Sequence, residues 1–354
     1  MTRASSRHSL PPTMTTSYKL TALAAALAGL PGLAGLAPAG LVRLEAKGVS
    51  HDHWRLAGRD LVVRVARFHQ WGLTPAAALA YEAAAFERAA ASRHTPRLHA
   101  TMPVAEGLPM GALVVDHVAG RPPRLPDDMG AIAAALAALH ALAVPAECSP
   151  LLVHDDPFAA TLAVIEEQAA FLPGAELAPQ SREAIEAELD WARAEARRSG
   201  RARPPLALVG TDTHPGNFLV DGGGKAWFVD LEKALYGAAA IDLAHATLAA
   251  STGWDPDCAA ALGRDEVRAF YRAYFDASER ASALGPTLDE FRRLTWLRTI
   301  TWFGRWRADW AASKPDAKRR AAPHIAAHVD ASLTPAAVAR QRREWFGPEP
   351  LRLG

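Results

Sequence analysis

The sequence predicts an α+β protein with a small β-rich lobe followed by a large, mostly helical lobe. Residues 42–68 contain short runs of β-branched residues bounded by turn residues, which is typical of an antiparallel meander. From Met129 onward the pattern is largely helical, interrupted by one pair of short strands. We therefore expect a disordered tail at 1–17, an N-lobe at 18–118 and a C-lobe at 119–354.

Composition limits the partners of the protein. The 354 residues carry a formal net charge of +1, so no strong attraction to nucleic acid or to an anionic membrane is expected. The two cysteines, Cys148 and Cys258, have no spacing typical of zinc and are interpreted as reduced thiols. We predict a small-molecule ligand and neither a nucleic-acid nor a membrane partner; the composition does not predict an oligomeric state.

The apolar run at 20–42 has some features of a secretory signal. A long polar stretch separates Arg3 and Arg7 from it, however, and two prolines and several glycines interrupt it. We therefore predict a short helix at 18–30 and a cytoplasmic protein, with Met14 as an alternative start.

Within the N-lobe, "LVVRVARF" (61–68) predicts a strand, with turns at 48–54 and 56–60. Residues 74–92 predict a strong helix that Thr74 caps and that alanines fill. A second strand is expected within 111–120.

Within the C-lobe, helices are expected at 129–143 and, as a pair, within 157–199, where they would shape the substrate side. The catalytic hairpin is expected within 208–234, as two short strands joined by "DGGG". Because these glycines lead into a strand and not into a helix, they predict a tight hairpin turn and not a phosphate-binding loop.

Three oxygen-bearing residues flank this hairpin. Asp212 and Asn217 lie five residues apart in the loop that leads into the first strand, and Asp230 ends the returning strand. A hairpin brings its two ends together, and two oxygen ligands from opposite strands suit Mg²⁺, which also keeps its phosphate partners. Each residue alone is as readily explained as a turn residue, but the ordered set favours a phosphoryl-transfer site.

The stretch "TDTHPGNFLVDGGGKAWFVDLEKA", followed by "IDLAH", resembles the aminoglycoside phosphotransferase and choline kinase group of the protein-kinase-like fold. The resemblance extends over most of 42–327 and is specific only in the catalytic stretch. It implies a bilobal kinase that transfers the γ-phosphoryl group of Mg·ATP to a hydroxyl of a small metabolite, amino sugar or amino alcohol.

The resemblance also implies roles for residues. Asp212 matches the catalytic aspartate that orients the acceptor hydroxyl, while Asn217 and Asp230 match the magnesium ligands. Glu232 and His214 match positions that support this site.

Asp242, in the "DLA" segment, is expected to hold the catalytic loop, and a plain helix N-cap is an equally open alternative.

The sequence departs from the family pattern in two places. Gly210 and Thr211 replace the His-Gly that precedes the catalytic aspartate, which predicts altered packing and not lost chemistry. No lysine lies between Lys47 and Lys225, so Arg64 is expected to contact the nucleotide phosphates. Its partner is expected to be Glu82, with Glu87 as the second choice.

Ser50 would help to cover the nucleotide, although this part of the pattern is weak. His51 and His53 would share one face of a strand, but without a visible third metal ligand we interpret them as loop or surface residues.

Trp302, Trp306 and Trp310 lie on one face of a predicted helix. They suit the core of the helical lobe or, alternatively, an aromatic wall that holds a cationic acceptor. The missing lysine and the altered loop also leave open an inactive pseudokinase that binds a nucleotide or another ligand.

Overall fold

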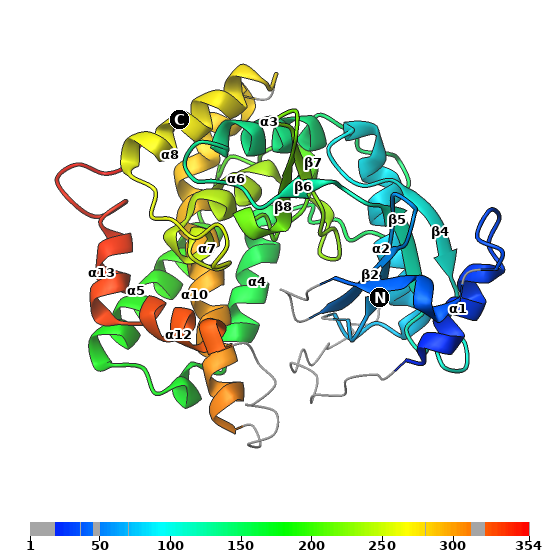
Figure 1. The fold of residues 1–354 in the computed structure, drawn as a ribbon. Helices are drawn as coiled ribbons and strands as arrows, with labels where there is room; N and C mark the ends of the chain where they lie inside the picture. The colour runs from blue at the N-terminus through cyan, green and yellow to red at the C-terminus, as the bar shows by residue number, and fades with distance from the viewer. Residues whose placement is uncertain are drawn as a thin grey trace. The chain divides into compact units, whose positions relative to one another are not determined.

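A computed structural model describes most of the chain, and it divides the chain into two compact units, residues 1–119 and 120–354. The expected tail at 1–17 lies outside the described residues, and Figure 1 shows the fold of the chain. The described residues are 18–35, 37–44, 50–69, 71–279, 281–312 and 323–353.

The first unit is built on a five-stranded antiparallel sheet with the strand order β1-β2-β3-β5-β4. The central strand β3 is rich in valine and is paired on both sides, which is why its pattern is readable from the sequence. The strands are β1 (Leu41–Arg43), β2 (His51–Leu56), β3 (Leu61–Ala66), β4 (Leu98–Met102) and β5 (Ala112–Asp116).

The turn expected at 48–54 is wrong for its second half. His51 to Trp54 belong to strand β2, with His51 opposite Ala66 and Trp54 opposite Val63 of β3. The polar side chains suggested a turn, but His51 and Asp52 are buried, because both take part in ion pairs.

Helix α2 (Pro75–Ala89) begins as the sequence predicts. The Thr74 hydroxyl accepts a hydrogen bond from the Ala77 backbone N–H at 3.3 Å, and Pro75 occupies the first turn. The helix contacts β4 and β5 and buries Tyr81 and Phe86.

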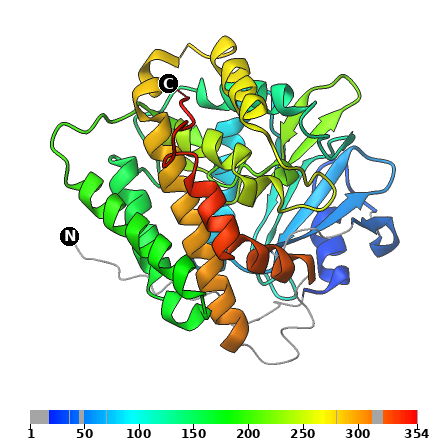
Figure 2. The ribbon, with the colours of Figure 1, turned by 90° about the vertical axis from the view of Figure 1, so that its left-hand side faces the viewer.

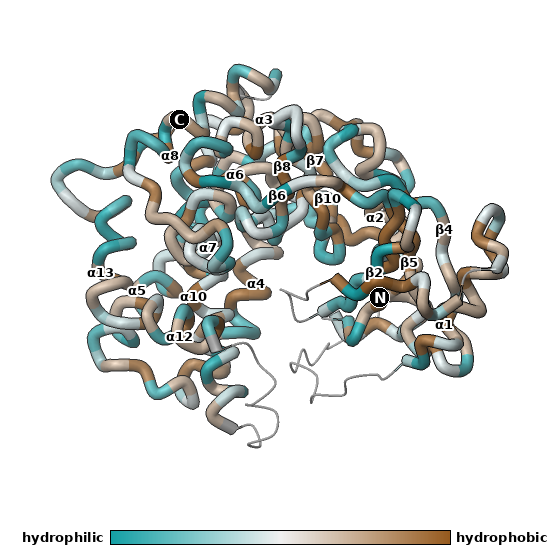
Figure 3. Tube along the Cα trace, in the orientation of Figure 1, coloured by the Kyte–Doolittle hydropathy of each residue, from teal (hydrophilic) through white to brown (hydrophobic). Residues whose placement is uncertain are grey.

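The apolar N-terminal run contributes to the core of the first unit. Helix α1 (Leu20–Ala28) forms where it is expected, and Figure 3 shows the hydropathy along it. Leu23 and Leu27 are fully buried in a cluster with residues of β1, β2 and β3. Among the described residues, no helix combines the length and hydrophobicity that crossing a membrane requires.

The second unit contains two small antiparallel sheets. Strands β6 (Gly120–Arg121), β8 (Phe218–Asp221) and β9 (Ala226–Phe228) form one, and β7 (Leu206–Val209) pairs with β10 (Leu235–Ala238) in the other.

The glycine run closes the β8–β9 hairpin. The Asp221 carboxylate accepts hydrogen bonds from the backbone N–H groups of Gly223 and Lys225, and Gly224 has a φ of +83°. The prediction of a hairpin turn is therefore confirmed.

The remainder of the second unit is helical. The long helix α10 runs through this unit (Figure 2) and contacts α4, α5, α6 and α12. Its fully buried Phe291, Trp296 and Phe303 form part of the core. The helices are α3 (Met129–His140), α4 (Pro157–Ala169), α5 (Pro179–Ala196), α6 (Ala239–Thr247), α7 (Ala249–Thr252), α8 (Arg264–Asp276), α9 (Ala281–Leu284), α10 (Leu288–Ala312), α12 (Pro323–Ser332) and α13 (Pro335–Arg342).

Candidate active site

The loop between β7 and β8 is held by the carboxylate of Asp242. One carboxylate oxygen accepts a hydrogen bond from the Gly210 N–H at 2.7 Å, and the other accepts one from the Thr211 N–H at 2.8 Å. The His140 Nε2 atom lies 3.0 Å from the same carboxylate. Asp242 is the fourth residue of α6, whose N-cap is Ala238, so the N-cap alternative is wrong.

Thr211 adopts a left-handed backbone conformation, with a φ of +58°. This conformation is unfavourable for a β-branched residue, and it explains why a glycine suits this position. Two further contacts hold the residue in place: the Thr211 hydroxyl donates to the Lys233 carbonyl at 3.0 Å, and the Arg298 guanidinium donates to the Thr211 carbonyl.

Gly210 leaves room for an aromatic ring. A Cβ atom at this position would lie 2.6 Å from the ring of Phe228, which is buried. A histidine therefore does not fit here without displacing Phe228. The ring fills the space, and Asp242 anchors the backbone.

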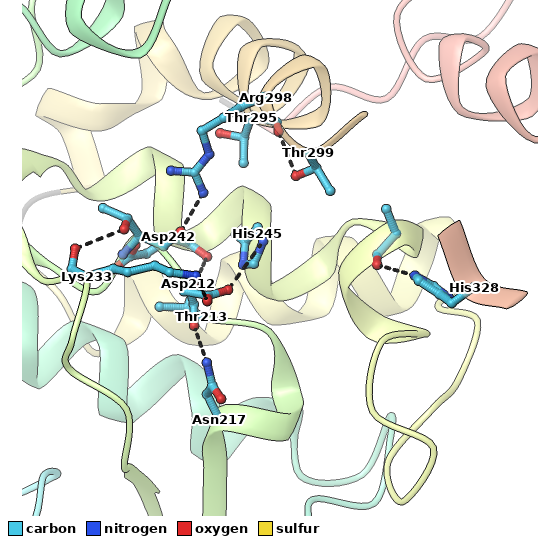
Figure 4. A network of polar contacts seen from close by, with 12 residues as sticks. Asp212, Thr213, Asn217, Lys233, Asp242, His245, Thr295, Arg298, Thr299 and His328 are labelled. Carbon is cyan, nitrogen blue, oxygen red and sulfur yellow. Dashed lines mark hydrogen bonds and ion pairs between the residues drawn. The ribbon is translucent and has the colours of Figure 1, made fainter. Parts of the chain in front are cut away.

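The carboxylate of Asp212 has a basic neighbour at each oxygen. The Lys233 ammonium lies 2.6 Å from Oδ2, and the Nε2 atom of His245 lies 3.9 Å from Oδ1 (Figure 4). Burial alone would raise the pKa of Asp212, but the charge and the hydrogen bond of Lys233 hold that pKa well below its usual range. Asp212 is therefore ionised at neutral pH.

The two imidazoles beside Asp212 are neutral at neutral pH. Burial lowers the pKa of His214, and burial together with nearby cations lowers the pKa of His245 to about 3. Within the described part of the chain, the buried Nδ1 atoms of both rings have no hydrogen-bond partner. Both nitrogens therefore lie inside the protein without a polar contact.

The metal ligands expected from the sequence lie at the open end of the hairpin. The Asn217 side-chain N–H₂ donates to the Asp212 carbonyl at 2.8 Å, so the amide oxygen of Asn217 is left for another partner. The Val229 N–H donates to the Asn217 carbonyl, which places Asp230 one residue beyond this backbone contact. A carboxylate and an amide oxygen from the two ends of a hairpin are ligands that suit Mg²⁺.

In the first unit, the structure joins Arg64 to Glu82. The Arg64 Nε atom donates to Glu82 Oε1 at 3.0 Å, and both side chains are buried. Burial opposes ionisation of Glu82, but His51 and Arg64 outweigh it and hold the pKa of Glu82 far below its usual range.

The interpretation of His51 and His53 as loop or surface residues is therefore wrong. Both lie on β2, where the Nε2 of His51 lies 3.0 Å from Glu82 and the Nε2 of His53 lies 3.2 Å from Arg64.

Glu87 was the second choice as the partner of Arg64, and Ser50 was expected to help cover the nucleotide. Glu87 is exposed, and Ser50 is buried immediately before β2. The residues just before Ser50, at 45–49, lie outside the described part of the chain.

The ion pair predicts a stability effect. We expect Glu82→Gln to lower the free energy of unfolding by about 2 kcal/mol, because Arg64 then loses its counter-charge inside the sheet. Urea unfolding measures this loss, and Glu87→Gln on the exposed face of the same helix is the matched control, with a change within about 0.5 kcal/mol. Equal effects of the two substitutions would contradict the importance of the buried pair.

The predicted aromatic face of α10 is divided between two clusters. Trp302 contacts Trp254 edge-to-face, with ring centroids 5.6 Å apart, and Trp254 lies 6.3 Å from His214. Trp306 and Trp310 stack on each other at 5.0 Å, beside a cavity of about 180 Å³. Trp302, Trp306 and Trp310 are all partly exposed, so, unlike the buried Trp296 of the same helix, they do not belong to the fully buried core.

Residues 42–280 match the phosphotransferase enzyme family, and the chain therefore belongs to this family. A search of the curated proteins gave no match.

Among solved structures, the chain is similar to a choline/ethanolamine kinase family protein from Mesorhizobium loti, with 20% identity, a TM-score of 0.60 and coverage of 93% of this chain and 96% of that one. It is also similar to a choline kinase from Cryptosporidium parvum, with 12% identity, a TM-score of 0.58 and coverage of 89% and 92%.

A third similar structure is a spectinomycin phosphotransferase in complex with ADP and spectinomycin, with 10% identity, a TM-score of 0.57 and coverage of 85% and 92%. These likenesses confirm the α+β, protein-kinase-like fold that the sequence predicts.

Proposed function

We propose that the protein is an ATP-dependent kinase that transfers the γ-phosphoryl group to a hydroxyl of a small molecule. Membership of the phosphotransferase family supports this proposal. The observation that carries it is the ionised Asp212 in a loop that also places Asn217 beside the returning strand. In a phosphoryl-transfer site, an aspartate orients the attacking hydroxyl while metal ligands lie next to it.

Asp212 acts in this proposal mainly by alignment. A carboxylate with a lowered pKa is a weak base, so it binds the acceptor hydroxyl as a hydrogen-bond acceptor and takes the proton only as the new O–P bond forms. This order suits phosphoryl transfer, in which positioning and charge stabilisation supply most of the acceleration.

Mg²⁺ and the nucleotide complete the proposed site. The amide oxygen of Asn217 and the carboxylate of Asp230 would hold Mg²⁺, which neutralises phosphate charge when it is bound. Arg64 would contact the phosphates, oriented by Glu82, and Ser50 would help to cover them.

Glu232 is buried beside Lys233 and would support the metal side of this site through its charge. We place the reaction in the cytoplasm.

The acceptor would lie on the side of Asp212 that faces the imidazoles. His245 and His214 lie on that side, and Trp254 lies beside His214 with Trp302 against it. Neutral imidazoles bind hydroxyl groups, and tryptophan faces pack against sugar rings or attract a cationic amine. Sugars, amino sugars and amino alcohols therefore all fit this description.

The test is ADP release from Mg·ATP with a panel of hydroxylated metabolites. We expect at least one acceptor to raise ADP release well above the rate without acceptor, and Mg·ATP to raise the melting temperature. A raised melting temperature with no acceptor-dependent turnover would instead support the binding-protein alternative.

A further inference from the structure

Lys233, which the sequence analysis did not single out, is tied twice to the catalytic loop. It follows β9 and lies three residues after Asp230. Its ammonium group donates to Asp212 Oδ2 at 2.6 Å, and its backbone carbonyl accepts from the Thr211 hydroxyl at 3.0 Å. The segment that carries the proposed metal ligand is thus connected directly to the proposed catalytic aspartate.

We propose that Lys233 is a positioning residue for phosphoryl transfer, which holds one oxygen of Asp212 so that the other oxygen faces the acceptor hydroxyl. The inference rests on the proposed kinase function and adds to it a residue that sets the orientation of the catalytic carboxylate.

The two carboxylate oxygens of Asp212 have different neighbours. Lys233 occupies Oδ2, while His245 Nε2 lies 3.9 Å from Oδ1, which is too far for a hydrogen bond. Oδ1 is therefore the oxygen that can meet a hydroxyl, on the side where His245 lies.

The backbone contacts of the loop do not by themselves fix the carboxylate. Asn217 binds the Asp212 carbonyl, which holds the main chain, but rotation about the last side-chain bond of an aspartate is only weakly restricted. A charge-assisted hydrogen bond from Lys233 supplies that restriction.

The surroundings of Lys233 suit this role. Its side chain is 23% exposed, so the ion pair is largely shielded from water. Burial alone would lower the pKa of Lys233, but Asp212 and Glu232 outweigh it and keep that pKa above its usual value. Asp230 adds to the same effect, so the ammonium lies in the field of both the proposed base and a proposed metal ligand.

The test is Lys233→Met, which keeps most of the side-chain length and removes the charge. We expect kcat to fall about 10–100-fold with the best acceptor, because a misoriented carboxylate costs roughly this much. The Kd for Mg·ATP and the melting temperature are expected to stay near the wild-type values. Lys233→Arg should stay within about fivefold of the wild-type kcat, since the cation is kept.

Lys225→Met is the matched control. Lys225 lies at the hairpin turn, with its ammonium 4.1 Å from the Trp227 ring centroid, and its loss should leave kcat unchanged. If Lys233→Met does not fold, Lys233→Gln is measured by the same criteria.

A double-mutant comparison distinguishes a positioning role of Lys233 from a general loss of activity. In the Asp212→Ala background, Lys233→Met should cause no further fall in kcat, because the carboxylate that it positions is gone. Additive losses, or a Lys233→Met enzyme with a kcat within twofold of wild type, would overturn the inference while leaving the kinase proposal intact. A wild-type protein that turns over no acceptor would overturn both.

Discussion

Replacing Asp212 with alanine is expected to lower kcat by about 10³-fold or more, with the Kd for Mg·ATP changed by less than about threefold. The Asp212 carboxylate is ionised. It forms an ion pair with Lys233 and lies beside the neutral His245. Its removal takes away the hydrogen-bond acceptor for the attacking hydroxyl. The loop itself is expected to stay in place, because Asp242 holds it through Gly210 and Thr211.

Acceptor-dependent ADP release measures the loss, and titration with Mg·ATP measures nucleotide binding. Asp265→Ala is a matched control, because Asp265 is 95% exposed in a surface ion pair with Arg268 and its loss should not change kcat. An Asp212→Ala enzyme that keeps its turnover within a few-fold of wild type would show that the role of Asp212 is assigned wrongly.

The parts of the fold that are readable from the sequence are those with local signals. Helix α2 is bounded by Thr74 and filled with alanines, and the β8–β9 hairpin has glycines where a turn needs them. Strand β2 was interpreted in part as a turn, because its polar residues are stabilised from elsewhere in the chain. His51 contacts Glu82, which is 31 residues away in the sequence, and no local pattern predicts such a contact.

The same distinction applies to the candidate site. Asp212, Asn217 and Asp230 were identifiable because they flank a short hairpin, which gives them a recognisable spacing in the sequence. Arg298 binds the Thr211 carbonyl from 87 residues away, and no local sequence pattern indicates that contact. The position of Lys233, three residues after Asp230, could have indicated that it lies near the site. Its ion pair, however, forms with Asp212, which lies 21 residues earlier in the loop between β7 and β8.

Asp242 is the residue on which the geometry of the loop depends most. Its side chain has no exposed surface, and it accepts hydrogen bonds from two backbone N–H groups while lying 3.0 Å from His140 Nε2. His140 is itself fully buried and lies 3.0 Å from the Tyr274 hydroxyl, so the network joins α3, α6, α8 and the catalytic loop. Loss of the carboxylate would leave three buried polar groups without this partner.

We therefore expect Asp242→Ala to lower the free energy of unfolding by about 3–5 kcal/mol, because each buried group left unsatisfied costs about 1–3 kcal/mol and the surroundings relax in part. Asp242→Asn keeps one accepting oxygen and should lose less. Guanidinium unfolding measures both, with the exposed Asp265→Ala as a control that should change the free energy by less than about 0.5 kcal/mol.

The kinetic consequence follows from the same contacts. Thr211 is held in an unfavourable left-handed conformation, and without the Asp242 carboxylate that conformation loses one of the hydrogen bonds that maintain it. We expect folded Asp242→Ala protein, assayed well below its melting temperature, to have a reduced kcat because Asp212 follows Thr211 directly. An unchanged unfolding free energy together with an unchanged kcat would mean that the loop is held by Arg298 and Lys233 alone.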